Sequence, residues 1–302
     1  MIIITGASGF IGKHLARQLL EKKKELLLCY HYHDISRLFP RAKALKIDLT
    51  KKNELRRLPA KGIEAVVHLA ACIPQSVSCD SIENFDACMQ GNLVSTVNVL
   101  EYCRLHSVKR LVYTSTVSVY GPTSQPPKEE SACYPQVFYG WSKLAAEMLC
   151  EKYRRDFGIG CFSLRLGSVY GAGQHPNWVI SKFIHSARHG KPVTVWGEGE
   201  RRIDFVYVRD VVSAILCALA SFKPGVYNIG SGKPVRIKEL ARVAVEIFSE
   251  GGASLFFDKG KSEDAVPAWL DISKAKKLLG YLPAYSLRKG LKDYRRQTGC
   301  AF

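Results

Sequence analysis

The chain opens with Met1-Ile2-Ile3-Ile4-Thr5-Gly6-Ala7-Ser8-Gly9-Phe10-Ile11-Gly12, an apolar run that leads directly into three glycines spaced three apart. The run has the length and composition of a buried strand, and a helical pattern follows it. Small residues at such a turn let the backbone approach a phosphate, and a helix amino terminus offers unpaired N–H groups and a favourable dipole. A tight packing turn would look similar, but the context favours a dinucleotide-binding loop.

Apolar runs of strand length alternate with amphipathic stretches of helix length through the first half of the chain. This alternation is typical of βαβ units and predicts an α/β fold with a doubly wound parallel sheet. In such a sheet, ligands bind beyond the carboxyl ends of the strands. The expected strands are residues 1–5, 25–30, 44–47, 65–69, 110–115 and 161–166, and the expected helices are residues 12–22, 86–106 and 139–157.

The pattern loosens after Tyr170, where glycine-rich turns separate short elements. We expect residues 1–170 to form a dinucleotide-binding domain. Residues 171–302 are expected to form mainly a smaller substrate-binding lobe that faces this domain across a cleft. The boundary is soft, because residues 193–206 or 226–229 could return to the main sheet.

The composition is that of a globular protein, with 47% hydrophobic and 24% charged residues among 302. The longest nearly apolar run, residues 211–220, is about half the length of a membrane-spanning helix. The amino terminus begins as a strand and shows no signal-peptide pattern. Ten cysteines are scattered without a C-x-x-C pair or zinc-ligand spacing. We therefore expect a cytoplasmic protein with reduced thiols, no metal and no membrane contact.

The formal net charge of +17 is unusual, and residues 271–302 carry eight Lys or Arg against two Asp. No nucleic-acid motif or aromatic stacking platform accompanies this charge. A solvated basic face on terminal helices is therefore favoured over a nucleic-acid partner. A basic surface would also attract an anionic substrate over long range.

A second decisive segment is Tyr139-Gly140-Trp141-Ser142-Lys143. Two residues four apart on a helix share one face, so the ammonium of Lys143 would lie beside the phenol of Tyr139. A nearby positive charge favours the ionised form of a phenol, whose pKa is ordinarily about 10. Such a phenolate is a general base for an alcohol that gives hydride to a nicotinamide. A tyrosine at a helix start that merely packs on Trp141 is the alternative.

Several further motifs follow in a fixed order along nearly the whole chain. They are Asp48-Leu49, His68-Leu69-Ala70-Ala71, Asn92 with Thr96, Ser115-Thr116, Val119-Tyr120-Gly121, Arg165 with Val169-Tyr170-Gly171, Asp204-Phe205-Val206-Tyr207-Val208, Asn228-Ile229-Gly230 and Asp271-Ile272-Ser273-Lys274-Ala275. Each motif is weak alone, but jointly they are highly specific. The chain resembles the extended short-chain dehydrogenases/reductases of the NAD-dependent epimerase/dehydratase family, and within it the sugar-nucleotide enzymes of the UDP-galactose 4-epimerase type.

By this resemblance Tyr139 is the catalytic base, Lys143 holds the cofactor ribose and lowers the pKa of Tyr139, and Thr116 hydrogen-bonds the reacting oxygen. A threonine hydroxyl both donates and accepts, although Ser115 and Ser118 compete for this role. His68 is expected to be structural. The resemblance places the NAD or NADP site at Gly6, Ser8, Gly9, Phe10, Ile11, Gly12, Tyr30, Asp48, Leu49, Leu69, Ala70, Ala71, Asn92, Thr114, Tyr139 and Lys143.

Two departures from the family pattern restrict the function. Val117-Ser118 follow Thr116 where the dehydratases have Asp-Glu for water elimination, so dehydration is disfavoured. The acidic residue that binds the adenosine ribose in NAD enzymes is replaced by Tyr30, with His31 and Arg37 nearby. A carboxylate there would repel a 2′-phosphate, so NADP(H) should be tolerated and the choice between NAD and NADP stays open.

The usual diphosphate contacts are also altered. Ile203 and Lys261 stand where family members commonly have arginines, with Arg201 and Arg202 slightly out of register, and Ser168 replaces a usual Asn. Lysine keeps the charge of arginine but loses its bidentate fork. Solvated surface charges are the alternative. The expected substrate-binding residues are Ser168, Arg201, Arg202 and Lys261.

We therefore expect an NAD(P)-dependent sugar-nucleotide epimerase that transiently oxidises a sugar hydroxyl. A 4-ketoreductase of a nucleotide sugar or another carbonyl compound would use the same residues and a dissociable NADPH. A cofactor-binding regulatory protein without catalysis is a third option, against which the intact Thr116, Tyr139 and Lys143 argue. The expected partner is a nucleotide sugar, and a homodimer stays open.

Overall fold

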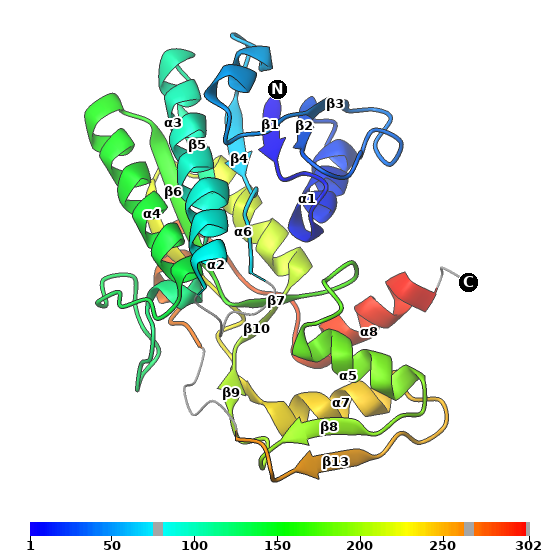
Figure 1. The fold of residues 1–302 in the computed structure, drawn as a ribbon. Helices are drawn as coiled ribbons and strands as arrows, with labels where there is room; N and C mark the ends of the chain where they lie inside the picture. Colours follow the sequence, from blue (N-terminus) through cyan, green and yellow to red (C-terminus); the bar gives the residue numbers. More distant parts are fainter. Residues whose placement is uncertain (75–80, 263–268, 300–302) are drawn as a thin grey trace.

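A computed structural model describes residues 1–74, 81–262 and 269–299 of the chain. Its centre is a seven-stranded parallel sheet in the order β11-β6-β5-β4-β1-β2-β3 (Figure 1). This confirms the doubly wound α/β fold expected from the alternating pattern. The strands of the sheet are β1 (Ile2–Thr5), β2 (Leu26–Tyr30), β3 (Lys43–Lys46), β4 (Ala65–His68), β5 (Arg110–Thr116), β6 (Gly160–Leu166) and β11 (Gly225–Ile229).

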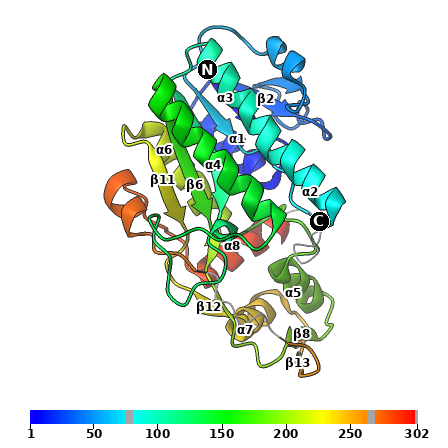
Figure 2. The same ribbon diagram turned by 60° about the vertical axis from the view of Figure 1, so that its left-hand side comes forward.

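Alternate residues of the central strands feed two separate cores, one on each face of the sheet. Ile2 and Ile4 of β1 join the core that contains α1 (Phe10–Glu21) and α6 (Val208–Ala220). Ile3 joins the opposite core, which contains α3 (Ser95–Leu105) and α4 (Phe138–Phe157). Figures 1 and 2 show these helices covering the two faces. Strands buried on both faces explain the nearly continuous apolar runs of the sequence.

Residues 86–106 do not form the single regular helix that the pattern predicts. They are divided into α2 (Ile82–Cys88), a π-helical turn η2 (Met89–Val94) and α3. A side chain at Gly91 would bring its Cβ within 2.8 Å of Cys72 Cβ, so the loop after β4 packs directly on this turn. The remaining short helical segments are η1 (Lys52–Arg57), η3 (Val117–Val119) and η4 (Ala275–Leu279).

A smaller lobe lies beyond the carboxyl ends of the main strands and has its own apolar core (Figure 1). It contains α5 (Val179–Arg188), α7 (Ile237–Phe248) and the parallel pair β8 (Val193–Trp196) and β13 (Leu255–Asp258). The remaining elements are the parallel pair β7 (Ser168–Tyr170) and β10 (Phe205–Tyr207), the antiparallel pair β9 (Arg202–Ile203) and β12 (Val235–Arg236), and α8 (Leu287–Gly299).

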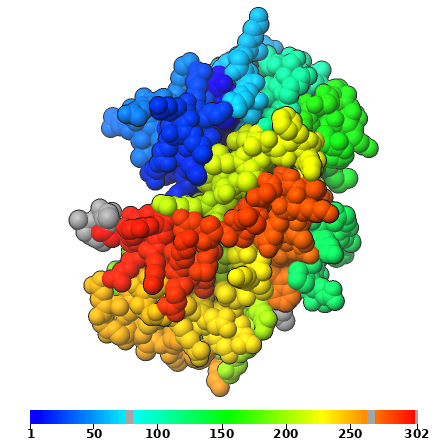
Figure 3. Space-filling view, turned by 180° about the vertical axis from the view of Figure 1, so that it is seen from behind, coloured from blue at the N-terminus to red at the C-terminus, as the bar shows by residue number. Residues whose placement is uncertain are grey.

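The last described segment ties the two parts together. Seen from behind, residues 269–299 cross the junction between the main sheet and the smaller lobe (Figure 3). Asp210 of α6 accepts hydrogen bonds from the backbone N–H groups of Ala284 and Tyr285. The Tyr207 hydroxyl donates to Asp293 of α8 at 2.7 Å. Polar contacts therefore fix the lobe against the sheet.

Among the residues that the structure describes, no helix combines the length and apolar character needed to cross a bilayer. No group of three or more His, Cys, Asp or Glu side chains in the same ranges is arranged to hold a metal ion. The cysteines of these ranges form no disulfide with one another, and most are buried; Cys79 and Cys300 lie outside the described residues.

Candidate active site

The glycine turn forms a narrow cradle at the carboxyl end of β1. Gly6 has φ +65°, and an added Cβ would lie 2.6 Å from the Ala70 nitrogen. At Gly12 an added Cβ would lie 2.5 Å from the Gly6 carbonyl oxygen. Gly9 is the N-cap of α1 and makes no side-chain cap, so the first N–H groups of the helix are open to an anion. These features fit the pyrophosphate of a dinucleotide.

Behind this cradle a buried hydroxyl and imidazole network holds the loop after β4. Thr5 Oγ1 lies 2.7 Å from His68 Nδ1 and accepts a hydrogen bond from Ala70 N at 3.3 Å. His68 Nε2 lies 3.1 Å from Thr96 Oγ1. Burial lowers the pKa of His68 to about 3, so the imidazole is neutral. A neutral histidine bonded on both nitrogens is structural, and it fixes Leu69, Ala70 and Ala71 beside the glycine turn.

Asn92 bridges the same loop to α4. Its side chain accepts from Cys72 N at 2.7 Å and donates to Cys72 O at 3.0 Å. It also donates to Ser142 Oγ at 2.9 Å. The Asn92 amide thus hydrogen-bonds both the backbone of the loop and Ser142 in the helix that carries Tyr139 and Lys143. Asn92 therefore braces the loop after β4 against α4.

The adenosine end of the expected cofactor site has no carboxylate at the tip of β2. Tyr30 occupies that place, and its hydroxyl bonds Asp34, which also accepts from Ser36 N. Asp48 accepts from both Thr50 N and Thr50 Oγ1, at 3.0 and 2.7 Å. His31 and Lys51 lie 3.9 and 3.6 Å from the Asp48 carboxylate. His31 and the Lys51 ammonium therefore lie beside Asp48, the acid among the adenosine-side residues predicted above.

Helix α4 brings Tyr139 and Lys143 to the carboxyl end of β5, which carries Thr114 and Thr116. The Lys143 ammonium donates to the Thr114 carbonyl at 2.7 Å and faces the Tyr113 ring at 4.6 Å and the Tyr139 ring at 6.0 Å. The structure thus brings together the three residues predicted to be catalytic. Burial lowers the pKa of Lys143 to about 8.

The phenol of Tyr139 differs from the expectation. Burial raises its pKa above the ordinary range, and a hydrogen bond with Thr116 acts in the opposite direction. The Lys143 ammonium donates a hydrogen bond to the Thr114 carbonyl rather than to the phenol. Desolvation therefore outweighs the ammonium, and proton transfer through Tyr139 depends on the groups that favour its ionised form.

One more turn along α4 lies a buried ion pair that the motifs did not identify. The Arg165 guanidinium donates to both oxygens of Glu147, at 2.7 to 3.1 Å, and to the Tyr120 hydroxyl at 2.8 Å. The side chains of Arg165 and Glu147 are 6% and 4% exposed, respectively. The i, i+4, i+8 spacing of Tyr139, Lys143 and Glu147 is the sequence signal that could have identified Glu147 as part of this region. The pair fastens α4, the helix that carries Tyr139 and Lys143, to β6.

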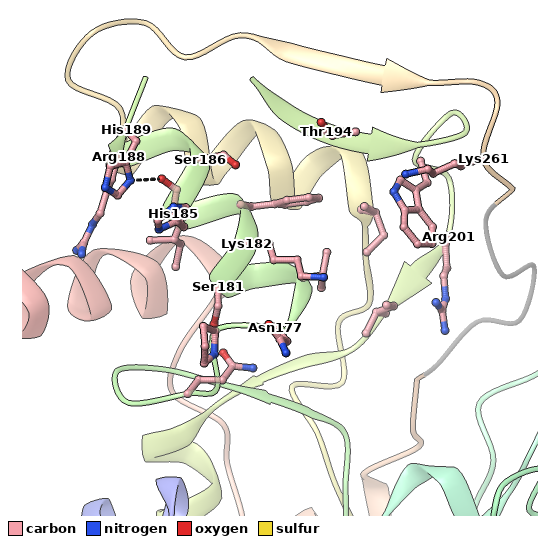
Figure 4. A pocket seen from close by; sticks show the side chains of 18 of the residues that line it. Asn177, Ser181, Lys182, His185, Ser186, Arg188, His189, Thr194, Arg201 and Lys261 are labelled. Atoms are coloured by element: carbon pink, nitrogen blue, oxygen red, sulfur yellow. Dashed lines mark hydrogen bonds between the residues drawn. The ribbon is translucent and has the colours of Figure 1, made fainter. Parts of the chain in front are cut away.

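A cavity of about 1020 Å³ opens in the smaller lobe, between α5 and the strands β8 and β9. Its described lining contains Lys182, Arg188, Arg201 and Lys261 and no Asp or Glu. Figure 4 shows Lys182 reaching from α5 toward the wall that carries Arg201 and Lys261. The Lys261 ammonium lies 5.1 Å from the centre of the Trp196 ring. An anionic ligand with a flat group fits this lining.

The predicted substrate residues divide into two groups in the structure. Arg201 and Lys261 line the cavity, whereas Ser168 and Arg202 do not. Successive side chains of a strand point to opposite faces, and Ile203 of β9 lines the cavity. Arg202 is exposed and paired in register with Arg236 of β12, on the other face. Lys182 was missed, because nothing in the sequence ties this exposed lysine of α5 to a distant strand.

The loop between β7 and α5 links the cavity to the glycine turn. His14 Nε2 of α1 donates to the Ala172 carbonyl at 2.8 Å. A Cβ at Gly173 would lie 3.9 Å from the Phe10 ring. Gln174 lines the cavity and donates to the Val169 carbonyl of β7. A single short loop therefore touches both the expected cofactor site and the cavity.

Comparison with known proteins gives concordant matches. The model of the NAD dependent epimerase/dehydratase family matches residues 2–230. A UDP-glucuronate 4-epimerase of Thermodesulfobacterium geofontis is 30% identical, with 96% of this chain and 93% of that protein covered. The solved UDP-glucuronic acid 4-epimerase of Bacillus cereus, in complex with UDP-glucuronic acid and NAD, is 32% identical with a TM-score of 0.85, and 98% and 99% of the chains are covered. The UDP-glucose 4-epimerase of Thermotoga maritima with UDP-glucose is 29% identical with a TM-score of 0.87 and the same coverage.

Gly9→Val should block the dinucleotide before it disturbs the fold. An added Cβ at Gly9 lies 3.1 Å from the Gly6 carbonyl, a contact that a small shift relieves, but the branched side chain would fill the phosphate cradle. The variant should melt near the wild-type temperature and show no thermal shift with NAD(H) or NADP(H). Gly12→Ala is the control and should lower the melting temperature, because its Cβ meets backbone at 2.5 Å. A normal shift in Gly9→Val would place the cofactor elsewhere.

Lys143→Met should stabilise the protein while removing its turnover. The buried ammonium has its pKa lowered to about 8 from 10.5, so folding disfavours the charged lysine. This penalty is complete below pH 8 and fades as the pH rises from 8 to 10.5, where the native lysine is already neutral. We expect a gain of about 2 kcal/mol at pH 7 that shrinks toward pH 10. Urea unfolding at both pH values measures it, and a pH-independent or negative difference would contradict the burial argument.

Proposed function

Because the chain belongs to the NAD-dependent epimerase/dehydratase family, we propose that it is a nucleotide-sugar epimerase that transiently oxidises a sugar hydroxyl. The observation that supports this function best is the meeting of Tyr139, Lys143 and Thr116 at the end of β5, beside the glycine turn. A cavity lined by cations in the adjacent lobe supports an anionic, nucleotide-linked substrate.

The dinucleotide is proposed to lie along the carboxyl ends of β1, β2 and β4. The N–H groups at the start of α1 and the backbone of Gly6 and Gly9 would hold its pyrophosphate. Lys143, whose ammonium already donates to a carbonyl at the end of β5, would hold the nicotinamide ribose. When bound, NAD(P) supplies a hydride acceptor that later returns the hydride to the sugar carbon.

The reaction assigns one role to each polar side chain. Tyr139 takes the proton of the sugar hydroxyl as its carbon is oxidised, and gives a proton back when the keto group is reduced. Thr116 hydrogen-bonds the reacting oxygen and stabilises the phenolate. The keto sugar turns over between the two half-reactions, so hydride returns to the opposite face. Lys143 keeps a positive charge 6.0 Å from the Tyr139 ring, and the hydrogen bond with Thr116 offsets part of the burial that raises the pKa of Tyr139.

The diphosphate is proposed to lie in the cavity of the smaller lobe. Arg201 and Lys261 approach from one wall and Lys182 from α5, so cations face the anion from both sides. The exposed ring of Trp196 lies beside Lys261 and offers a stacking face for the base. This arrangement would replace the usual Arg and Asn contacts, which Ile203 and Ser168 cannot make.

A 4-ketoreductase is the second candidate. The absence of a carboxylate at the tip of β2, with His31 and Lys51 near Asp48, is compatible with the 2′-phosphate of a dissociable NADPH. The catalytic side chains would be the same, with Tyr139 acting as the acid. Tightly bound nicotinamide in the purified protein favours the epimerase, and stoichiometric consumption of added NADPH favours the reductase.

Tyr139→Phe tests the base. Turnover of the nucleotide sugar should fall roughly 100-fold or more, because the phenol is the group proposed to take the hydroxyl proton. Cofactor affinity, measured by fluorescence titration, should stay nearly unchanged, since the ring and its packing are kept. Near-wild-type turnover would remove Tyr139 from the mechanism.

Arg201→Ala and Lys182→Ala test the diphosphate site, with Arg202→Ala as the matched control, because Arg202 is the exposed neighbour of Arg201 that does not line the cavity. Loss of one charge-assisted hydrogen bond should cost on the order of 1.5 to 3 kcal/mol. The KM for the nucleotide sugar should therefore rise at least about tenfold in the first two variants. Cofactor affinity should not change. An equal rise of KM in Arg202→Ala would show that the general positive field of the lobe, and not direct contact in the cavity, attracts the nucleotide sugar.

A further inference from the structure

We propose that His14 is a positioning residue for the nucleotide sugar. It holds the loop of residues 171–177, which forms one wall of the cavity in the smaller lobe, against α1, the helix that carries the glycine turn. The inference rests on the proposed function, because it assumes that this cavity takes the nucleotide diphosphate. It adds a residue that belongs neither to the predicted cofactor site nor to the lining of the cavity.

The first observation is a direct hydrogen bond between α1 and the loop. His14 Nε2 lies 2.8 Å from the Ala172 carbonyl oxygen, and in Figure 1 the loop between β7 and α5 reaches toward α1. Burial lowers the pKa of His14, and the nearby Arg17 and Arg209 act in the same direction. A carbonyl can only accept, so the neutral imidazole carries its proton on Nε2. The contact is therefore a hydrogen bond between two uncharged groups.

The helix that carries His14 is itself fixed to the main sheet. Leu15, Ala16 and Leu19 are buried in the core on one face of that sheet. His14 shares a different face of the helix with Phe10, one turn earlier, and their rings meet edge to face with centroids 5.7 Å apart. Phe10 also packs against the apolar core of the smaller lobe. Phe10 and His14 therefore form a side of α1 that is turned toward this lobe.

The loop depends on such an external restraint because Ala172 lies between two glycines. Gly171 and Gly173 have φ angles of +151° and +86°. Gly171 is buried against Val208, whereas Gly173 is exposed, and the nearest neighbour of an added Cβ there would be the Phe10 ring at 3.9 Å. Glycine loses more conformational freedom on folding than any other residue. The His14 hydrogen bond thus restrains the carbonyl that directly precedes the most flexible point of the loop.

The same loop supplies part of the cavity wall. Gln174, Pro176 and Asn177 line the cavity. The Gln174 side chain donates to the Val169 carbonyl at 3.0 Å, and its Oε1 is buried without a hydrogen-bond partner among the described residues. An oriented acceptor of this kind suits a hydrogen-bond donor of the ligand. A shift at Ala172, two residues earlier, would move this wall and weaken substrate binding.

The dinucleotide should not share this dependence. Its pyrophosphate is proposed to contact the backbone N–H groups at the start of α1, and the buried residues on the opposite side of the helix hold these groups in place. The catalytic side chains of β5 and α4 make no recorded contact with His14. Loss of the His14 hydrogen bond is therefore expected to raise KM for the sugar and to change kcat and cofactor affinity little.

The test compares two neutral amides at position 14 of the full-length enzyme. A glutamine places its amide nitrogen near the position of His14 Nε2, whereas an asparagine ends closer to the backbone and cannot reach the Ala172 carbonyl. His14→Asn should raise the Kd of UDP and the KM for UDP-glucose about tenfold, and His14→Gln less than about threefold. The GDP, CDP or dTDP compounds replace these probes if the wild type prefers one of them. In both variants kcat and the Kd of NAD(H) or NADP(H) should stay within about threefold of the wild type.

Two further variants separate the hydrogen bond from general effects. Lys13→Asn is the matched control, because Lys13 is the exposed neighbour on α1 and asparagine lowers helix propensity there too; the Kd of UDP should not change. In a Gln174→Ala background, His14→Asn should have much less effect on this Kd, since both residues act through one wall. Should His14→Asn fail to fold, His14→Leu takes its place.

The inference is wrong if His14→Asn binds UDP like the wild type, or if His14→Gln is impaired as strongly as His14→Asn. It is also overturned if His14→Asn keeps its full effect in the Gln174→Ala background. A parallel loss of dinucleotide affinity would give His14 only a general structural role in α1. These results leave the proposed function standing. If the wild type binds the dinucleotide but none of the nucleotide probes, the proposed function fails, and this inference fails with it.

Discussion

Lys143 keeps an ammonium in a place that water does not reach, and the elements around the site are arranged to compensate for it. The side chain is 1% exposed, donates to the Thr114 carbonyl and is flanked by two tyrosine rings. An uncompensated charge in the interior is expensive, so helix and strand must hold their relative positions closely. The Arg165–Glu147 pair one turn further on supplies that rigidity between α4 and β6. Asn92 does the same between α4 and the loop after β4.

Local patterns in the sequence were sufficient to predict the fold and the meeting of Tyr139, Lys143 and Thr116. Strand-length apolar runs and the glycine turn are local signals, and the seven-stranded sheet confirms the fold that they predict. The meeting of Tyr139, Lys143 and Thr116 also follows, because parallel strands end at one edge of a sheet and α4 follows that edge. The division of residues 86–106 into α2, η2 and α3 could not be predicted from the sequence, because the π turn packs against Cys72, which lies outside this segment.

The sequence could not predict which charged residues face the cavity, because this depends on pairing between distant segments. Arg201 and Arg202 are neighbours of equal charge, and only the pairing of β9 with β12 determines which of them faces the cavity. Lys182 comes from a different element on the opposite wall. The pKa of Tyr139 was misjudged for a related reason: spacing along a helix reports the neighbouring lysine but not the desolvation that the rest of the fold imposes. Placement relative to solvent is a property of the assembled protein.

The cations that line the cavity suit a substrate that is held firmly at one end and moves at the other. Interactions remote from the reacting carbon can supply binding and orientation. Strong ionic contacts to the sugar ring would have to be broken in every turnover.

The return of the chain to the main sheet makes the two parts of the molecule inseparable as pieces of sequence. Strand β11 pairs with β6 at one edge, and α6 covers a face of the same sheet together with α1, although both follow α5 and β8 of the smaller lobe. A chain ended at residue 170 would leave β6 as an open edge with unpaired N–H and C=O groups and an uncovered apolar face. An exchange of substrate lobes with a relative would therefore have to graft several separate inserts into a continuous scaffold. In this architecture a new sugar specificity is reached more readily through individual side chains than through whole-module exchange.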